Sequence, residues 1–372
     1  MEKDSGIAAN EKSSSPKLVR GVFLAVLAGL LINTFMGLFI DAEEFKTAFT
    51  GVSIVTFLVP FLTIILVYLI DTFRYKLVFS RFSIKASFRD SLYNNIIGYF
   101  FSNVTPGSVG GQPFQILHFS RLGLDSAITS NVVFSRLIET TFVQLIIVVI
   151  FFHKGIGMMA SLGNGAYLLG AGMLVTLILT ALLLLGFLNP HLLGVLALKI
   201  EKSWLGKLIA KMTKDPRWAE KLSVWSQGLG AGFKVLWNQN FGIMLIDMLL
   251  AGFGQVLWSL ALYVPLTMLA GTPPPFPEFL LSFVVCSLVS LFIPTPGASG
   301  STEASFLLVL STLTGKPGVT MSAILIWRFG AYYLHLLFGG LVYFFVPTRK
   351  AVYVKGEDGI LRHIRPSRRS AQ

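Results

Sequence analysis

Long apolar stretches alternate with short polar connections along most of the chain. A helix needs about 20 apolar residues to cross the roughly 30 Å hydrocarbon core of a bilayer. Six stretches reach this length, at residues 21–40, 51–70, 127–152, 165–188, 241–270 and 319–346. The pattern therefore predicts an all-α integral membrane protein with about six transmembrane helices.

Two further apolar stretches are too short to cross a bilayer, and each ends in a Gly/Pro break. Residues 92–102 run into Thr105-Pro106-Gly107, and residues 279–293 run into Thr295-Pro296-Gly297. A second short helical stretch follows each break. Broken backbone at membrane depth is tolerated only where protein or water surrounds it. We therefore expect two re-entrant helical hairpins, over residues 91–122 and 279–313.

The composition agrees with a chain whose main solvent is lipid. Hydrophobic residues make up 54% of it and charged residues only 13%, with a mean hydropathy of +0.72. Soluble domains carry roughly 25% charged residues. The net charge of +12 does not predict a nucleic-acid partner, because cytoplasmic loops of membrane proteins collect Lys and Arg for topological reasons.

The Lys and Arg residues also predict an orientation. In the predicted topology 25 of the 30 lie on one side, and the other side receives only Lys46, Lys154 and Lys316. The positive-inside rule then places both termini in the cytoplasm of a multi-pass protein of the cell (cytoplasmic or inner) membrane. The predicted parts are a cytoplasmic tail at 1–18, a membrane half at 19–188, a basic amphipathic cytoplasmic connection at 189–240, a second membrane half at 241–346 and a basic cytoplasmic tail at 347–372.

The two breaks are alike in sequence and face opposite ways in the predicted topology. Both fit the pattern TPGxxG, at an interval of 190 residues, and an arginine in a long apolar span follows each of them, Arg136 and Arg328. These features together indicate a weak inverted-topology repeat.

Breaks that meet near the bilayer midplane are typical of substrate sites in transporters, where exposed backbone N–H groups suit an anion such as phosphate. The alternative is that Pro and Gly mark tight turns between packed helices. The candidate substrate-binding residues at the breaks are Pro106, Gly107, Gly110, Gly111, Gln112, Pro296, Gly297 and Gly300.

Buried ionisable residues add further candidates, because an arginine at mid-depth costs at least ~2.5–3.5 kcal/mol. Arg136 has Glu139 three residues on, so an internal ion pair and a substrate-phosphate contact both stay open. Arg328 has no nearby acid on its own helix and needs Glu303, a backbone carbonyl or a bound anion. Glu303 itself suits either a helix cap or a ligand role.

Other polar groups within apolar segments are candidates by default. Asp247 and His335 lie in predicted spans. In the first hairpin a polar stripe runs along the returning helix, at Gln112, Gln115 and His118, and the entering helix adds the amide groups of Asn94, Asn95 and Asn103, all of which could line a cavity. Cys286 is the single cysteine, and the histidines show no ligand spacing. We therefore expect no metal and no cofactor. Nucleotide-binding, hydrolase and zinc-protease motifs are absent, which argues against an enzyme.

Four motifs carry a resemblance to a known family. They are the run from Asn103 to Pro113 (NVTPGSVGGQP), Ser135-Arg136-Leu137, the run from Pro294 to Glu303 (PTPGASGSTE) and Trp327-Arg328. The chain resembles the lysylphosphatidylglycerol synthase transmembrane-region family over roughly residues 17–346. In this family the membrane region translocates aminoacylated phospholipid, and full-length members add a cytoplasmic domain that makes the lipid.

The resemblance implies a flippase-like lipid translocase for an anionic or aminoacylated phospholipid. It assigns the site to Pro106, Gly107, Gly110, Gly111, Arg136, Pro296, Gly297, Gly300, Glu303 and Arg328. Only 26 residues follow residue 346, so we expect no lysyl transfer by this chain and leave open a separate lipid-synthesising enzyme as partner. A lipid-modifying system whose catalytic domain is absent here and a membrane scaffold are the alternatives, and the sequence is compatible with an oligomer.

Overall fold

The computed structural model describes residues 52–105, 110–161, 189–213, 215–290, 297–346, 352–356 and 358–364, with isolated residues elsewhere. Within these ranges four helical runs are long and apolar enough to cross a membrane. They are α3 (Ile54–Phe79), α6 (Ser126–Ile150), α12 (Phe241–Ala270) and the run α15 (Pro317–Arg328), η3 (Phe329–Leu334) and α16 (His335–Phe345). The predicted all-α membrane fold is confirmed, while the predicted spans 21–40 and 165–188 lie almost entirely outside the described residues.

The ends of these helices are set by local chemistry. Asp125 caps α6, and its carboxylate accepts hydrogen bonds from the backbone N–H groups of Ala127 and Ile128 at 2.9 and 3.0 Å. Gly271 ends α12 with a φ of 74°, the left-handed conformation that glycine adopts without steric cost. Each span therefore begins or ends where the sequence changes from apolar to turn-forming residues.

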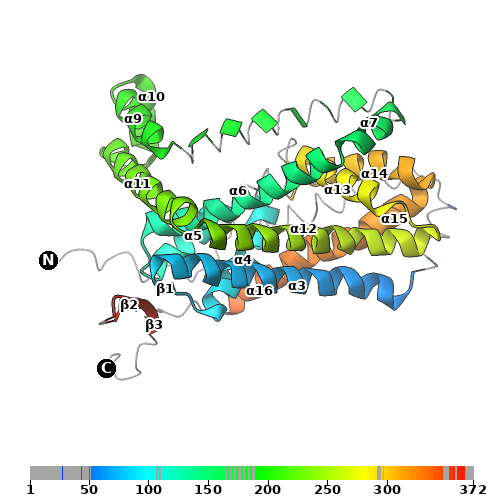
Figure 1. Cartoon of the computed structure of the whole chain (residues 1–372), viewed down its shortest axis with the longest axis horizontal. Helices are drawn as coiled ribbons and strands as arrows, with labels where there is room; N and C mark the ends of the chain where they lie inside the picture. Colours follow the sequence, from blue (N-terminus) through cyan, green and yellow to red (C-terminus); the bar gives the residue numbers. More distant parts are fainter. Residues whose placement is uncertain are drawn as a thin grey trace.

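The long helices lie side by side, as Figure 1 shows. α12 packs along α3 and also contacts α6 and α15. Thr56, near the start of α3, contacts Met268 near the end of α12, whereas Arg74 near the end of α3 bonds Asp247 near the start of α12. These two helices are therefore antiparallel.

The two predicted hairpins are present as pairs of packed helices. The first consists of α4 (Phe88–Val104) and α5 (Gly111–Arg121), and the second of α13 (Phe276–Ser290) and α14 (Ser301–Thr314). α4 and α13 begin three or four residues before the predicted starts. Their first turns carry the polar Asp90 and Glu278, so the apolar pattern shows only the later part of each helix.

The hairpins open toward opposite ends of the molecule. α4 follows strand β1 (Ile84–Lys85), and the carbonyl of Leu122, just after α5, accepts from the backbone N–H of Tyr353 in strand β2 (Val352–Lys355). The second hairpin begins just after α12 and ends just before α15, where Lys316 bonds the carbonyl of Ala270 at 3.1 Å. We call these two ends the sheet end and the far end; each hairpin leaves and returns at the same end.

A small sheet that the sequence pattern did not predict gives the sheet end its name. Strand β3 (Leu361–Ile364) pairs in parallel with β1 and antiparallel with β2. Tyr353 is buried beneath it, and its hydroxyl accepts from the backbone N–H of Ser87 at 3.0 Å. Part of the tail predicted at 347–372 is thus a structural element that closes over the base of the first hairpin.

The connection at 189–240 is helical, as its pattern indicated. It contains α9 (Pro190–Ile200), α10 (Trp204–Thr213), α11 (Trp218–Phe233) and the π-helical turn η2 (Lys234–Asn238). α11 packs against α9 and α6, and the indole N–H of Trp225 donates to the hydroxyl of Ser130 at 3.2 Å. At the opposite end, α7 (Phe152–Ser161) continues α6 after a short turn.

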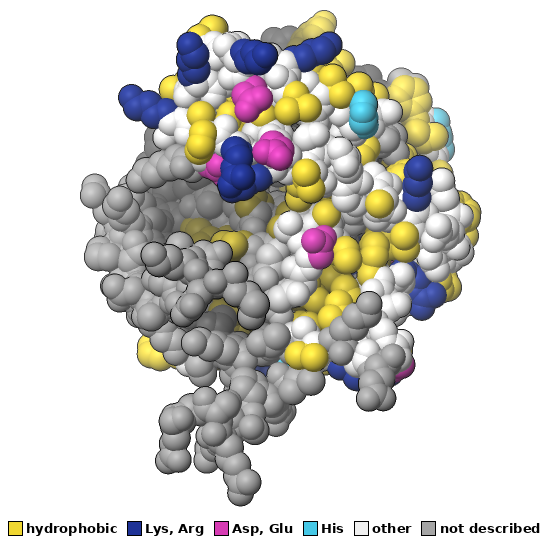
Figure 2. Space-filling view, turned by 90° about the vertical axis from the view of Figure 1, so that its left-hand side faces the viewer, with side chains coloured by type: hydrophobic (Ala, Val, Ile, Leu, Met, Phe, Trp, Pro, Cys, Tyr) yellow, Lys and Arg dark blue, Asp and Glu magenta, His cyan; other side chains and the backbone are white. Residues whose placement is uncertain are grey.

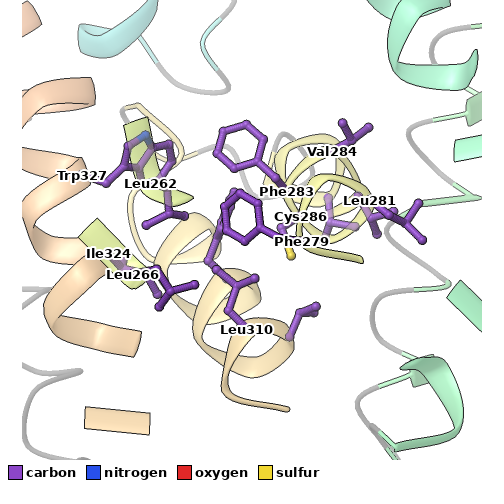
Figure 3. Packing of buried hydrophobic residues seen from close by; sticks show 14 of the residues in the cluster. Leu262, Leu266, Phe279, Leu281, Phe283, Val284, Cys286, Leu310, Ile324 and Trp327 are labelled. Carbon is purple, nitrogen blue, oxygen red and sulfur yellow. The ribbon is translucent and has the colours of Figure 1, made fainter. Parts of the chain in front are cut away.

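The largest buried apolar cluster holds the second hairpin against the spans. Phe279 and Phe283 of α13, Leu310 of α14, Leu262 of α12 and Trp327 of α15 come together in it (Figure 3). Burial of each such side chain stabilises a fold by about 1.5–3 kcal/mol. The second hairpin is therefore anchored in the protein core and is not a lipid-facing loop.

The outer surface is of two kinds. Along the spans, large apolar side chains point outward, and Ile54, Val149 and Leu249 are 73%, 74% and 65% exposed. Single exposed apolar side chains occur on soluble proteins too, but a surface that carries them along whole helices fits contact with lipid. At the sheet end, by contrast, Lys and Arg side chains lie along the upper and right-hand parts of the rim (Figure 2).

Candidate functional site

The described parts of the two breaks share one backbone hydrogen bond. In the first, the N–H of Ser108 donates to the carbonyl of Thr105 at 3.2 Å, and in the second the N–H of Ala298 donates to the carbonyl of Thr295 at 3.0 Å. Ser108 and Ala298 hold equivalent places in the motif and both have a positive φ, of 57° and 52°. This conformation is uncommon outside glycine, so the two breaks share an unusual backbone conformation at this position. They differ at the last glycine of the motif, where φ is −75° at Gly110 and 90° at Gly300.

The tips of the hairpins meet inside the molecule. A Cβ added to Gly297 would lie 2.1 Å from Cε2 of Tyr332 and 3.2 Å from Oδ1 of Asn103, the penultimate residue of α4. Gly297 also has a φ of 57°. The second break therefore lies against the end of the first hairpin, and only glycine fits at the contact.

Arg328 holds the second break. Its Nε and Nη2 donate to the two carboxylate oxygens of Glu303, both at 2.9 Å, and Nη1 and Nη2 donate to the carbonyls of Gly297 and Ala298 at 3.2 and 3.3 Å. Glu303 in turn accepts from the backbone N–H of Gly300 at 2.7 Å. We call this set the Arg328 clamp, and of its five guanidinium N–H groups one, on Nη1, is not used by these contacts.

These contacts supply two of the three partners expected for Arg328, namely Glu303 and backbone carbonyls. Glu303 combines the cap and the ion-pair roles. Arg328 is the twelfth residue of its run, about 17 Å from the far end at 1.5 Å per residue. The π-helical turn η3 begins at the next residue, a feature that often marks functional sites because it interrupts regular helix.

Arg136 is held differently, and of the two alternatives left open for it, the ion pair with Glu139 is not the one that forms. Nη2 of Arg136 bonds Asp71 at 2.6 Å, and its guanidinium lies 3.8 Å from the ring centre of Tyr75. Glu139 instead bonds Nη2 of Arg74 at 2.9 Å. Although Arg136 and Glu139 lie on one face of α6, α3 brings both an acid and a base against that face.

Arg74 is the centre of a buried cluster. Its Nη1 bonds Asp71 at 3.1 Å, its Nε bonds Asp247 of α12 at 2.9 Å, and Asp247 also lies 3.4 Å from its Nη2. We call the five residues Asp71, Arg74, Arg136, Glu139 and Asp247 the charge cluster. It lies toward the sheet end, since Asp71 and Arg74 are about 12 and 8 Å of helix from the end of α3.

The first hairpin contacts this cluster through α4. The hydroxyl of Tyr99 donates to Asp71 at 2.9 Å, and Asn95 accepts from Arg136 at 3.4 Å while donating to Thr72 at 3.1 Å. Any movement of α4 must therefore change contacts to Asp71 and Arg136.

Asp71 and Arg74 were missed as site residues because the predicted span ended at residue 70 and Arg74 was counted with the polar connection. The signal was present, since Asp71 and Arg74 are spaced at i and i+3 and apolar residues continue to Phe79. Asp247, a candidate from its apolar surroundings alone, is part of the cluster.

The remaining predicted residues divide into three groups. Gly110 and Gly111 begin α5, and a Cβ on Gly111 would lie 2.2 Å from the hydroxyl of Ser102, so this glycine permits close helix packing. Gln112 is half-buried in the same turn. Pro106, Gly107 and Pro296 lie outside the described residues.

Two other predicted polar groups have local partners. His118 of α5 bonds the side chain of Asn94 of α4 at 3.0 Å, which ties the two helices of the first hairpin together. His335 lies among the rings of Tyr68, Tyr99 and Trp258, with Nδ1 3.1 Å from the carbonyl of Gly330.

Comparison with known proteins gives one matching family and one relative. The sequence profile of the family described as "Lysylphosphatidylglycerol synthase TM region" matches residues 22–339. A protein of Archaeoglobus fulgidus described as "UPF0104 membrane protein" is 23% identical over 330 residues, which cover 86% of this chain and 94% of that protein. The family match includes both breaks, the Arg328 clamp and the charge cluster.

Proposed function

Because the chain belongs to the lysylphosphatidylglycerol synthase TM-region family, we propose that it translocates an anionic or aminoacylated phospholipid between the leaflets of the cell membrane. The observation that carries the proposal is the meeting of two hairpin tips that enter from opposite ends. A lipid head group that crosses the bilayer needs polar groups at mid-depth, and opposed broken helices supply them in transporters.

The Arg328 clamp is the part that fits a head group. It offers a guanidinium and a carboxylate at mid-depth, already paired with each other. Arginine binds phosphate through paired N–H groups, and a carboxylate binds an ammonium group. An aminoacylated phospholipid carries both a phosphate and an ammonium, so it can exchange with each partner of the clamp without leaving a buried charge unpaired.

In the proposed cycle, the two hairpins alternate in giving access to the Arg328 clamp. Separation of the tips at Gly297 and Asn103 would open the clamp to one end while the other hairpin stays closed, and the acyl tails would remain in lipid along the exposed apolar spans. The basic rim at the sheet end favours a cytoplasmic orientation for that end. A separate enzyme would supply the lipid.

Reconstituted vesicles with fluorescent phosphatidylglycerol or its lysylated form on one leaflet test this proposal. Wild type is expected to equalise the leaflets, and Arg328→Met to lose this activity. Arg328→Met alone leaves the carboxylate of Glu303 buried and unpaired, which can unfold the protein. The double variant Arg328→Met/Glu303→Gln therefore provides a folded reference that lacks both charges of the clamp. Lys154→Met, which removes the Lys154–Glu278 ion pair at the far end, is the matched control and should transport normally.

The outcome that would contradict the proposal is equal lipid movement in wild type, the double variant and protein-free vesicles. That result would favour a scaffold that organises other membrane components. Movement that is unchanged in the double variant but faster than in empty vesicles would place the lipid path elsewhere than the clamp.

A further inference from the structure

The charge cluster contains more acids than bases. Asp71, Glu139 and Asp247 are three carboxylates, and Arg74 and Arg136 are two guanidinium groups, so full ionisation leaves a net charge of −1. Glu139 and Asp247 have side chains that are 0% exposed. An uncompensated charge in such surroundings is expensive, and a bound cation or proton would remove it.

The three carboxylates are not equally well bonded. Asp71 accepts from Arg74, Arg136 and Tyr99, and both oxygens of Asp247 contact Arg74. Glu139 accepts only one hydrogen bond, from Arg74 to Oε2, and its buried Oε1 has no partner among the described residues. A bare carboxylate oxygen that is cut off from water is the least stable acceptor of the three.

We propose that Glu139 binds one exchangeable proton, which makes the charge cluster neutral and gives its Oε1 a hydrogen to donate. Asp247 is the neighbouring carboxylate, because its Oδ2 and Oε2 of Glu139 contact the same nitrogen of Arg74. A metal ion suits the site less well, since no group of three or more His, Cys, Asp or Glu in the described part of the chain could hold one.

The titratable and charged groups around the charge cluster come from several packed helices. α3 brings Asp71, Arg74 and Tyr75, α12 brings Asp247, and α6 itself brings Arg136. Tyr99 of α4 lies behind Asp71. On the other helices that pack against α6, three titratable groups bond elsewhere: His118 of α5 on Asn94, Lys221 of α11 on Asp215 and Glu278 of α13 on Lys154.

The proton can reach the charge cluster from the side of Asp71 and Arg136, and the same two residues link it to the first hairpin. Asp71 and Arg136 have side chains 13% and 10% exposed, the most accessible of the cluster, and both contact α4 of the first hairpin. Movement of that hairpin therefore alters the stabilisation of Asp71 and hence the charge that Glu139 must balance. The proton site stands by itself; its coupling to lipid movement rests on the proposed function.

Infrared difference spectroscopy of the reconstituted full chain tests the proton site without any transport assay. At neutral pH wild type should show the C=O stretch of a protonated carboxylic acid, shifted by D₂O and by ¹³C-labelled glutamate. The band should be lost in Glu139→Gln. It should also be lost in Asp247→Asn, because Asp71 and Glu139 then balance Arg74 and Arg136 and Glu139 no longer needs a proton. Glu278→Gln, outside the charge cluster, should keep it. A band that persists in Glu139→Gln, or that follows labelled aspartate, overturns the proposal, as does the absence of any such band in wild type.

Coupling is tested in vesicles with a pH gradient. Wild-type lipid movement should respond to the gradient, and Glu139→Gln should move lipid at a rate that the gradient does not change. Wild-type movement that ignores the gradient would overturn the coupling and leave the infrared result intact. An infrared band without any lipid movement would contradict the proposed function alone.

Discussion

The Arg328 clamp and the charge cluster are two answers to the same problem, an arginine buried in an apolar span. The clamp pairs one guanidinium with one carboxylate, and two loop carbonyls take further N–H groups. The cluster gathers three carboxylates around two guanidinium groups, and both Oε1 of Glu139 and Nε of Arg136 stay without a partner among the described residues. The first arrangement is balanced and the second is not.

The difference follows from where each arginine finds its acid. Glu303 comes from the same hairpin that Arg328 holds, so the clamp fixes the local shape of one break. The acids of the cluster come from α3, α6 and α12, so the cluster ties three spans together and contacts the first hairpin through Tyr99 and Asn95. The halves that look alike in sequence therefore differ in what their arginines control.

The largest expected effect comes from unbalancing the clamp. Glu303→Gln leaves Arg328 buried without a counter-charge and should destabilise the protein by about 3–5 kcal/mol, measured as thermal unfolding in detergent. Arg328→Met/Glu303→Gln should regain most of this loss, because no buried charge is left unpaired. A single variant as stable as wild type would mean that water or lipid already reaches the clamp.

The contact between the tips should give the next largest effect. Gly297→Ala combines a positive φ with a Cβ placed 2.1 Å from Tyr332, whereas Gly315→Ala has a similar φ of 66° and no neighbour within 4 Å. Both should lose about 1–2 kcal/mol from the backbone conformation. Gly297→Ala should lose about 1–3 kcal/mol more from overpacking, together with lipid movement. Equal melting temperatures of the two variants would show that Gly297 is not packed against Tyr332 and Asn103 in solution.

A smaller effect is expected where charge is already in excess. Glu139→Gln makes the same chemical change as Glu303→Gln, but it replaces the carboxyl that we propose to be protonated already, so its stability should stay within about 1 kcal/mol of wild type. Unfolding of the two Gln variants side by side is the measurement. A loss at Glu139 as large as that at Glu303 would mean that the cluster is balanced as it stands and that Glu139 is ionised.

Hydropathy and the positions of Gly and Pro were enough to predict the spans among the described residues and the two hairpins, and an arginine within an apolar span was enough to point to the Arg328–Glu303 pair. Local spacing failed for Arg136, because the partner of a buried charge depends on which helix packs against it. Asp71 and Arg74 were placed outside the span, since charged residues lower the hydropathy of a helix end even when that end is buried. The strands of the tail were missed because the apolar alternation in Val352–Lys355 is short and lies among basic residues.

The smallest effect belongs to an ion pair outside both regions. Lys154 and Glu278 pair at the far end, with side chains 35% and 22% exposed. Partly exposed pairs contribute about 0–1 kcal/mol, because water already stabilises each charge. Lys154→Met should therefore change the melting temperature little, with Glu278→Gln as its matched partner. A loss in either variant as large as that of Glu303→Gln would mean that burial does not distinguish the clamp from a partly exposed ion pair. Charge balance would then matter for stability at exposed and buried ion pairs alike.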